Sequence, residues 1–199
     1  MIAPIIIING PTAVGKTTVI KRILQRMPQL QTATTYTTRP LRKGQREDKK
    51  IIHVSEKEFQ TKIEAGALLE WSKHYGNFYG TAKKSITDAK GKPLLLNIGF
   101  AGPKIIKKIY SQAFLIFIRP ESMKQIKQRL LKRGITSSEF KRRYGEAIAA
   151  MKEAKIYDYQ VTNHEGKIGQ TVSQIERLIR TYLKSSQLEP IIDKKTKKR

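Results

Sequence analysis

The residues with the clearest chemical potential lie near the N-terminus, in the sequence INGPTAVGKTT at positions 8–18. Gly10, Gly15, Lys16 and Thr17 fit the spacing G-x-x-x-x-G-K-[ST]. In such a loop, successive backbone N–H groups form a nest for phosphates, the lysine reaches the outer phosphates, and the hydroxyl ligates Mg²⁺. The sequence therefore predicts a phosphate-binding loop over residues 10–18.

The segments on either side of this loop support that interpretation. Residues 4–9 have the pattern of a short strand buried on both faces, and residues 15–27 carry an apolar stripe with helical periodicity. A strand, a glycine loop and a helix N-terminus in this order direct the helix dipole at an anion.

Further along the chain, apolar runs alternate with helical patterns, which is typical of a parallel sheet built from βαβ units. Residues 36–82 break this alternation, so we expect an α/β fold with a core of residues 1–35 and 83–185 and a small inserted substrate-binding domain. The predicted strands are 4–9, 32–35, 93–98, 113–118 and 159–162, with an extended piece at 51–54; the predicted helices are 15–27, 55–65, 101–110, 122–133, 138–156 and 168–185.

Composition narrows the class of protein. Of the 199 residues, 39% are hydrophobic and 28% are charged, as in a globular domain, and no apolar stretch approaches the length of a membrane span. The absence of cysteine excludes disulfides and thiolate metal sites. The N-terminal apolar run is short and lacks a basic preface, so we expect a cytoplasmic protein without a signal peptide.

The chain is strongly basic, with 40 Lys and Arg against 16 Asp and Glu, a net charge of +24. Without residues 186–199, whose composition predicts a disordered basic tail, 35 basic and 14 acidic residues still give +21. Two interpretations remain open. One is a secondary contact with an anionic partner such as nucleic acid or a membrane surface; the other is a solvated basic surface around a phosphate site.

A second group of candidate residues lies within the insertion, in TYTTRPLRKG (35–44) and LLEWSKHYGNFYGT (68–81). Arg39 and Arg42 belong to a loop rich in hydroxyls, and guanidinium groups and hydroxyls both suit phosphate oxygens. Glu70 interrupts an apolar run, where a carboxylate requires hydrogen-bond donors. These residues predict a second polar site.

Together, these segments resemble the guanylate kinase family, over nearly the whole chain from about residue 5 to residue 183. The segments that carry the resemblance are GPTAVGKT (10–17), TTRPLRKG (37–44), EW (70–71), GNFYGT (76–81), RLLKRG (129–134), KRRY (141–144) and YDYQVTN (157–163). The resemblance implies a P-loop NTPase-type fold with a helical lid at about 134–150. It also implies transfer of a phosphoryl group from ATP, with Mg²⁺, to a nucleoside monophosphate, most of all GMP or dGMP.

The resemblance assigns roles to individual residues. Arg39, Arg42 and Tyr79 would hold the acceptor phosphate, and Thr35, Glu70 and Thr81 would read its base. Lys16, Arg39, Arg133 and Arg143 would form the catalytic set, the last two by neutralising charge on the transferred group from the lid and the adjoining helix. The ATP-binding set would be Gly10, Pro11, Thr12, Ala13, Val14, Gly15, Lys16, Thr17 and Thr18, with Thr17 as the metal ligand.

Three positions depart from the family pattern. Ile51 stands where a tyrosine usually helps to hold the acceptor phosphate, and Asn97 and Gly99 stand where two aspartates are usual. The second of those aspartates helps to read guanine, so the changes leave acceptor specificity and turnover open.

Two alternative functions follow from these departures. The change at this strand, together with TRP at 38–40, resembles the ribose 1,5-bisphosphate phosphokinases, but EW and GNFYGT keep the guanylate kinase form. A non-catalytic guanylate kinase-like module that binds peptides generally lacks a working phosphate loop, whereas residues 10–17 are complete here. We therefore expect a nucleoside monophosphate kinase.

Overall fold

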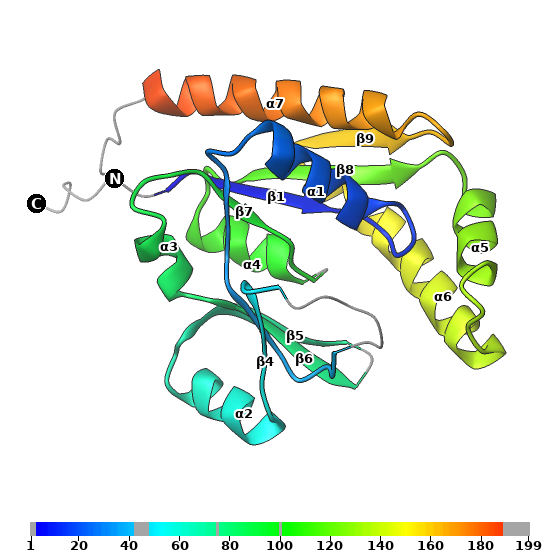
Figure 1. Cartoon of the computed structure of the whole chain (residues 1–199), viewed down its shortest axis with the longest axis horizontal. Helices are drawn as coiled ribbons and strands as arrows, with labels where there is room; N and C mark the ends of the chain where they lie inside the picture. Colours follow the sequence, from blue (N-terminus) through cyan, green and yellow to red (C-terminus); the bar gives the residue numbers. More distant parts are fainter. Residues whose placement is uncertain (1–2, 42–47, 75, 100, 189–199) are drawn as a thin grey trace, which may run out of the picture.

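The computed structural model describes residues 3–41, 48–74, 76–99 and 101–188, and Figure 1 shows two sheets of different size. The larger sheet has five parallel strands in the order β2-β7-β1-β8-β9. Their bounds are β1 (Ile5–Asn9), β2 (Gln31–Thr32), β7 (Leu94–Leu96), β8 (Phe114–Pro120) and β9 (Tyr159–Asn163). This confirms the predicted α/β fold with a parallel sheet.

Helices cover both faces of this sheet because its central strand is apolar on both sides. Ile6 and Ile8 of β1 pack in one buried cluster with residues of α1 and α7, whereas Ile5 and Ile7 pack in a second cluster with α4 and the end of α6. The helices are α1 (Lys16–Arg26), α4 (Gly102–Ile109), α5 (Met123–Leu131), α6 (Ser137–Glu153), which continues into a 3-10 turn (Ala154–Ile156), and α7 (Ile168–Leu188).

The insertion forms a second sheet of four strands, in the order β4-β3-β6-β5. The strands are β3 (Thr35–Thr37), β4 (Ile51–His53), β5 (Leu68–His74) and β6 (Asn77–Ala82), followed by the short helix α3 (Lys84–Asp88). Helix α2 (Glu56–Glu64) packs on one face, where Phe59 stacks on Phe78 with ring centroids 5.3 Å apart. The other face carries residues that the sequence predicts to bind the acceptor, described below.

The structure corrects two of the predicted elements and adds three that were not predicted. The single strand expected at 32–35 is divided between β2 of the larger sheet and β3 of the inserted sheet, because the chain crosses from one to the other at residues 33–34. Strands β5 and β6 and helix α3 were not predicted. Helix α7 runs to Leu188, three residues into the expected tail, and residues 189–199 lie outside the described residues.

Among the helices of the described residues, none combines the length and the apolar character that a membrane crossing needs.

Candidate active site

The phosphate loop lies between the carboxyl end of β1 and the start of α1, and two of its positions require glycine. A Cβ on Gly10 would lie 2.5 Å from the backbone oxygen of Ile118, so the loop passes too close to β8 for any side chain. Gly15 has a φ of +100°, and a Cβ there would lie 2.9 Å from Nδ2 of Asn163. The two glycines of the recognised spacing are therefore required by contacts with β8 and β9.

The start of α1 is suited to an anion. Its N-cap residue, Gly15, has no side chain to bond the N–H groups of the first turn, and that turn contains no acidic residue. Thr17 and Thr18 are exposed there. The first-turn N–H groups and the helix dipole therefore favour a negatively charged ligand at this end of the helix.

Lys16 is held at the mouth of the loop by the residue that ends β1. Its Nζ donates to Oδ1 of Asn9 at 3.2 Å and to the backbone oxygen of Gly10 at 3.1 Å. Burial lowers the pKa of Lys16 to about 8. The ammonium is therefore still charged at neutral pH, and a phosphate beside it would favour the charged form further.

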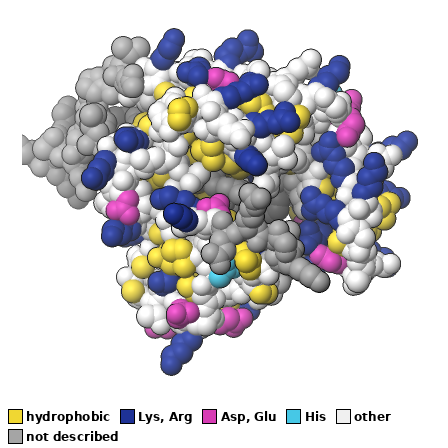
Figure 2. All heavy atoms as spheres, viewed as in Figure 1, with side chains coloured by type: hydrophobic (Ala, Val, Ile, Leu, Met, Phe, Trp, Pro, Cys, Tyr) yellow, Lys and Arg dark blue, Asp and Glu magenta, His cyan; other side chains and the backbone are white. Residues whose placement is uncertain are grey.

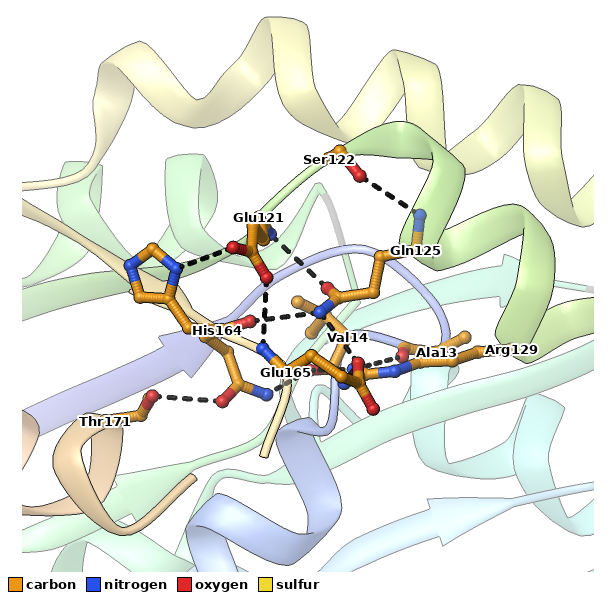
Figure 3. Close-up of polar contacts among 10 residues, drawn as sticks. Ala13, Val14, Glu121, Ser122, Gln125, Arg129, His164, Glu165 and Thr171 are labelled. Carbon is orange, nitrogen blue, oxygen red and sulfur yellow. Dashed lines mark hydrogen bonds and ion pairs between the residues drawn. The ribbon is translucent and has the colours of Figure 1, made fainter. Parts of the chain in front are cut away.

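A bracket of side chains behind the loop fixes the direction of its peptide groups (Figure 3). Nη1 of Arg129 donates to the backbone oxygens of Ala13 and Val14, each at 3.2 Å, and Nδ2 of Asn163 donates to the same Val14 oxygen at 2.8 Å. Ala13 has a left-handed φ of +61°. The Val14 N–H is used within the loop, where it donates to the Pro11 oxygen at 3.4 Å. With the Val14 carbonyl bonded at the back, the N–H of the same peptide, that of Gly15, can face the opposite side.

The bracket is itself supported by a further layer (Figure 3). Glu165 accepts from Nη2 of Arg129 at 2.6 Å and from the Gln125 amide at 2.9 Å, and the hydrogen bond with Arg129 holds the pKa of Glu165 below its usual range. Thr171 donates to Oδ1 of Asn163 at 3.0 Å, which fixes the amide with its nitrogen toward the loop.

Arg129 and Asn163 were missed as site residues, although both belong to segments that carry the family resemblance. The usable signal for Asn163 was its position just after the predicted strand 159–162, at the same sheet edge as the phosphate loop. The signal for Arg129 was its spacing of four residues from Arg133, which places both on one side of a helix.

The inserted sheet brings four predicted acceptor residues to one face. Thr35 pairs with Thr81, which in turn pairs with Glu70, and in the next row Thr37 pairs with Tyr79. Directly paired residues point to the same side of a sheet. Thr35, Glu70, Tyr79 and Thr81 therefore share the face opposite α2, which we call the acceptor face.

Glu70 is buried on this face, with 6% of its surface exposed. Its Oε1 accepts from the Thr81 hydroxyl at 2.6 Å, while burial raises the pKa of the carboxyl. Its Oε2 is directed at the start of α4, where a Cβ on Gly102 would lie 3.1 Å from it. A register shift between Leu68 and Glu70 places the carboxylate on this face. One carboxylate oxygen is thus fixed by the protein and the other is left beside the core.

The loop after β3 positions Arg39. Thr37 Oγ1 donates to the backbone oxygen of Phe78 at 2.9 Å and accepts from the Arg39 N–H at 3.1 Å, and Thr38 Oγ1 accepts from the Phe78 N–H at 2.9 Å. The hydroxyls of Thr37 and Thr38, expected to bond a phosphate, are therefore used to hold the loop. Arg42 lies outside the described residues.

The three residues that depart from the family pattern lie in different parts of the structure. Ile51 pairs with Thr35 and so lies on the acceptor face, whereas Asn97 is exposed. Gly99 follows β7, and its backbone oxygen lies 3.5 Å from Nδ2 of Asn9, a long contact. Gly99 therefore lies between the phosphate loop and the acceptor face.

The two arginines predicted for the lid region lie at the turn after α5 and on α6, and these two helices adjoin each other (Figure 1). Arg133 is exposed in the turn that follows α5, and Arg143 lies on α6, where its Nε donates to Glu139 at 2.8 Å. Glu139 occupies the preceding turn of the same helix, and its backbone N–H donates to Oγ1 of the N-cap residue Thr136 at 3.2 Å. It thereby holds the Arg143 guanidinium along the helix surface.

Comparisons with known proteins agree with this arrangement. The family model described as guanylate kinase matches residues 3–182. A guanylate kinase of Symbiobacterium thermophilum is 33% identical over 178 residues, covering 88% of this chain and 83% of that protein. One of Thermosynechococcus vestitus is 36% identical over 164 residues, covering 81% and 86%. The crystal structure of guanylate kinase from Anaplasma phagocytophilum has a TM-score of 0.73 and 26% identity, covering 90% of this chain and 86% of that one.

Proposed function

We infer that this chain, which belongs to the guanylate kinase family, is a phosphotransferase that phosphorylates GMP with ATP. The observation that carries this inference is the continuity between its two polar sites. Asn9 bonds Lys16 of the phosphate loop on one side and approaches the backbone oxygen of Gly99 on the other, next to the acceptor face. This continuity supports a site in which donor and acceptor phosphates would lie close together, as direct transfer requires.

We assign the donor to the phosphate loop and the acceptor to the inserted sheet. The loop N–H groups and Lys16 bind the β- and γ-phosphates of ATP, and Arg39, Arg42 and Tyr79 align the acceptor phosphate. Its oxygen is already anionic and needs no general base. Thr35, Glu70 and Thr81 bind the base. Arg133 and Arg143, from a lid at about 134–150, reduce the charge that builds up on the transferred group. We also assign residues 10–18 of this loop to ATP binding, as the sequence predicts.

The residues of the loop fit a magnesium ion bound mainly through ATP. The Thr17 hydroxyl is exposed in the first turn of α1, and the described residues contain no cluster of three acidic or histidine side chains that would hold a metal alone. Mg²⁺ typically takes one or two protein ligands and completes its shell with phosphates and water. Thr17 would be that ligand, and the ion would neutralise charge between the β- and γ-phosphates.

The basic surface suits two anionic substrates. Figure 2 shows Lys and Arg side chains spread over the visible face and outnumbering Asp and Glu. Such a field raises the local concentration of nucleotides. A secondary contact with nucleic acid is tested by whether duplex DNA inhibits the kinase at low salt and loses this effect at high salt.

The deciding experiment is a coupled assay of ADP release with GMP, dGMP, AMP, CMP, UMP and ribose 1,5-bisphosphate as acceptors. We expect turnover with GMP and dGMP above all others. Preferential turnover of the sugar phosphate, or ATP binding without turnover of any acceptor, would contradict the assignment.

A further inference from the structure

Gly99 is in unusually close contact with two polar side chains of β5. A Cβ built on Gly99 would lie 2.5 Å from Nε2 of His74 and 2.9 Å from Oγ of Ser72. The space in which residue 99 would carry a side chain is therefore filled by an imidazole and a hydroxyl that come from the inserted sheet.

These same two atoms are the buried side-chain polar atoms that have no hydrogen-bond partner within the described part of the chain. A buried polar atom without a partner destabilises the folded state, and such atoms are rare in native proteins. Two of them at one contact indicate that a partner is supplied from outside the chain.

Ser72 and His74 are also on the acceptor face. They follow Glu70 at alternate positions of β5, and Ser72 pairs with Tyr79 across the sheet. Tyr79 lies against the His74 ring, with centroids 6.3 Å apart. Glu70, Ser72 and His74 therefore form one row of hydrogen-bonding groups along the strand that faces the core.

We propose that Ser72 and His74 bind the 2-amino edge of the acceptor purine, in place of a side chain at position 99. This inference rests on the proposed function. The edge of guanine carries one imino N–H and one amino group, and all of their hydrogens are donors. Glu70 alone offers too few acceptors for them, because one of its oxygens already accepts from Thr81. The Ser72 hydroxyl oxygen and a neutral His74 Nε2 can accept the remaining hydrogens.

The location of the contact explains how a base reaches atoms that are covered in the ligand-free chain. Ser72 and His74 belong to the inserted sheet and Gly99 to the core. A change in the spacing of the two parts uncovers both atoms together, and the base then supplies the hydrogen bonds that they lack.

The test compares GMP with IMP, which lacks the 2-amino group. We expect His74→Leu, which removes the acceptor but keeps bulk, and Ser72→Ala each to lower the ratio of kcat/KM for GMP to that for IMP by about tenfold, the effect of one neutral hydrogen bond. His74→Gln, which keeps an acceptor, should recover part of the ratio. Lys73→Leu, on the opposite and exposed side of the same strand, is the matched control and should leave it unchanged.

Calorimetric binding of GMP and IMP to the same variants separates this inference from the proposed function. If neither nucleotide is phosphorylated but GMP binding still exceeds IMP binding and depends on His74, the kinase assignment fails and the recognition stands. An unchanged ratio in both variants, or an equal loss for GMP and IMP, would overturn the role of Ser72 and His74.

A double substitution tests the geometry directly. Gly99→Asp alone places a side chain against the His74 ring, so we expect weaker GMP binding. Gly99→Asp with His74→Ala removes the obstruction, and we expect GMP affinity to recover at least tenfold relative to Gly99→Asp alone. Equal GMP affinity of the single and the double variant would contradict the proposed contact.

Discussion

The phosphate loop and the acceptor face differ in whether their polar groups have hydrogen-bond partners within the chain. Around the loop, the chain itself supplies partners: Asn9 for Lys16, and Arg129 and Asn163 for the loop carbonyls. On the acceptor face, Ser72 and His74 have buried atoms that lack partners among the described residues.

This difference separates a preformed site from one that the ligand completes. A preformed loop binds the phosphates that every nucleoside triphosphate shares, and little reorganisation accompanies binding. A face with unsatisfied groups discriminates among bases, because a ligand that fails to bond them leaves their desolvation uncompensated. We therefore expect the loop to determine the chemistry and the inserted sheet to determine the choice of acceptor.

The largest effect is expected where the preformed site loses its charge. Lys16→Met should lower kcat by about 10²-fold or more, because we propose that this side chain neutralises the outer phosphates during transfer. Lys21→Met, an exposed change on the same helix, should be neutral. Steady-state kinetics with GMP and ATP measure both, and near-normal turnover of the Lys16 variant would remove the loop from the mechanism.

Next in size is the loss of the buried carboxylate from the acceptor face. Glu70→Gln should lower kcat/KM for GMP by roughly ten- to 150-fold, the range for one hydrogen bond to a charged group, with little change for AMP. Glu64→Gln, at an exposed position of α2, is the control. Parallel assays with GMP and AMP decide it, and an intact GMP preference would place base recognition elsewhere.

The bracket behind the loop should matter less than the loop itself. Arg129→Leu removes the guanidinium that bonds Ala13 and Val14 and should lower kcat/KM for ATP about tenfold, while the GMP-to-AMP ratio stays constant. Arg180→Leu, an exposed ion-pair change on α7, is the control. A change in acceptor preference would show that the two sites are not separable in this way.

The smallest effect is a pH dependence of the loop. Because Lys16 has a pKa of about 8 and acts in its charged form, kcat/KM for ATP should fall as the pH rises through 8, by about twofold at that pH. Bound phosphates favour the ammonium, so kcat should hold to higher pH. Lys16→Arg should abolish this alkaline limb, and a limb that persists in that variant would assign it to another group.

The sequence predicted strands β1, β7 and β8 of the larger sheet well, because they are buried on both faces and read as continuous apolar runs. It predicted the inserted sheet poorly. Strands β5 and β6 mix polar and apolar residues, and the register shift between Leu68 and Glu70 interrupts simple alternation. Helix α3 spans only five residues, too few to show a period.

The site was predicted in the same uneven way. Lys16 and the loop follow from a spacing that local geometry demands, and Glu70 was recognised as a carboxylate in an apolar run. Ser72 and His74 carried no such signal, because their role depends on Gly99, which is distant in the sequence and meets them only through the contact between the two sheets. Contacts of this kind are not encoded in any local pattern.

Asn9 lies between the two proposed substrate sites and contacts a residue on each side. Phosphates that bind Lys16 compete with the Asn9 side-chain oxygen for its ammonium, and the nitrogen of the same amide approaches Gly99. We expect ATP to change the affinity for GMP through this shared amide. Thermodynamic reciprocity then requires GMP to change the affinity for ATP by the same factor. A single asparagine side chain would thus couple the binding of the two substrates.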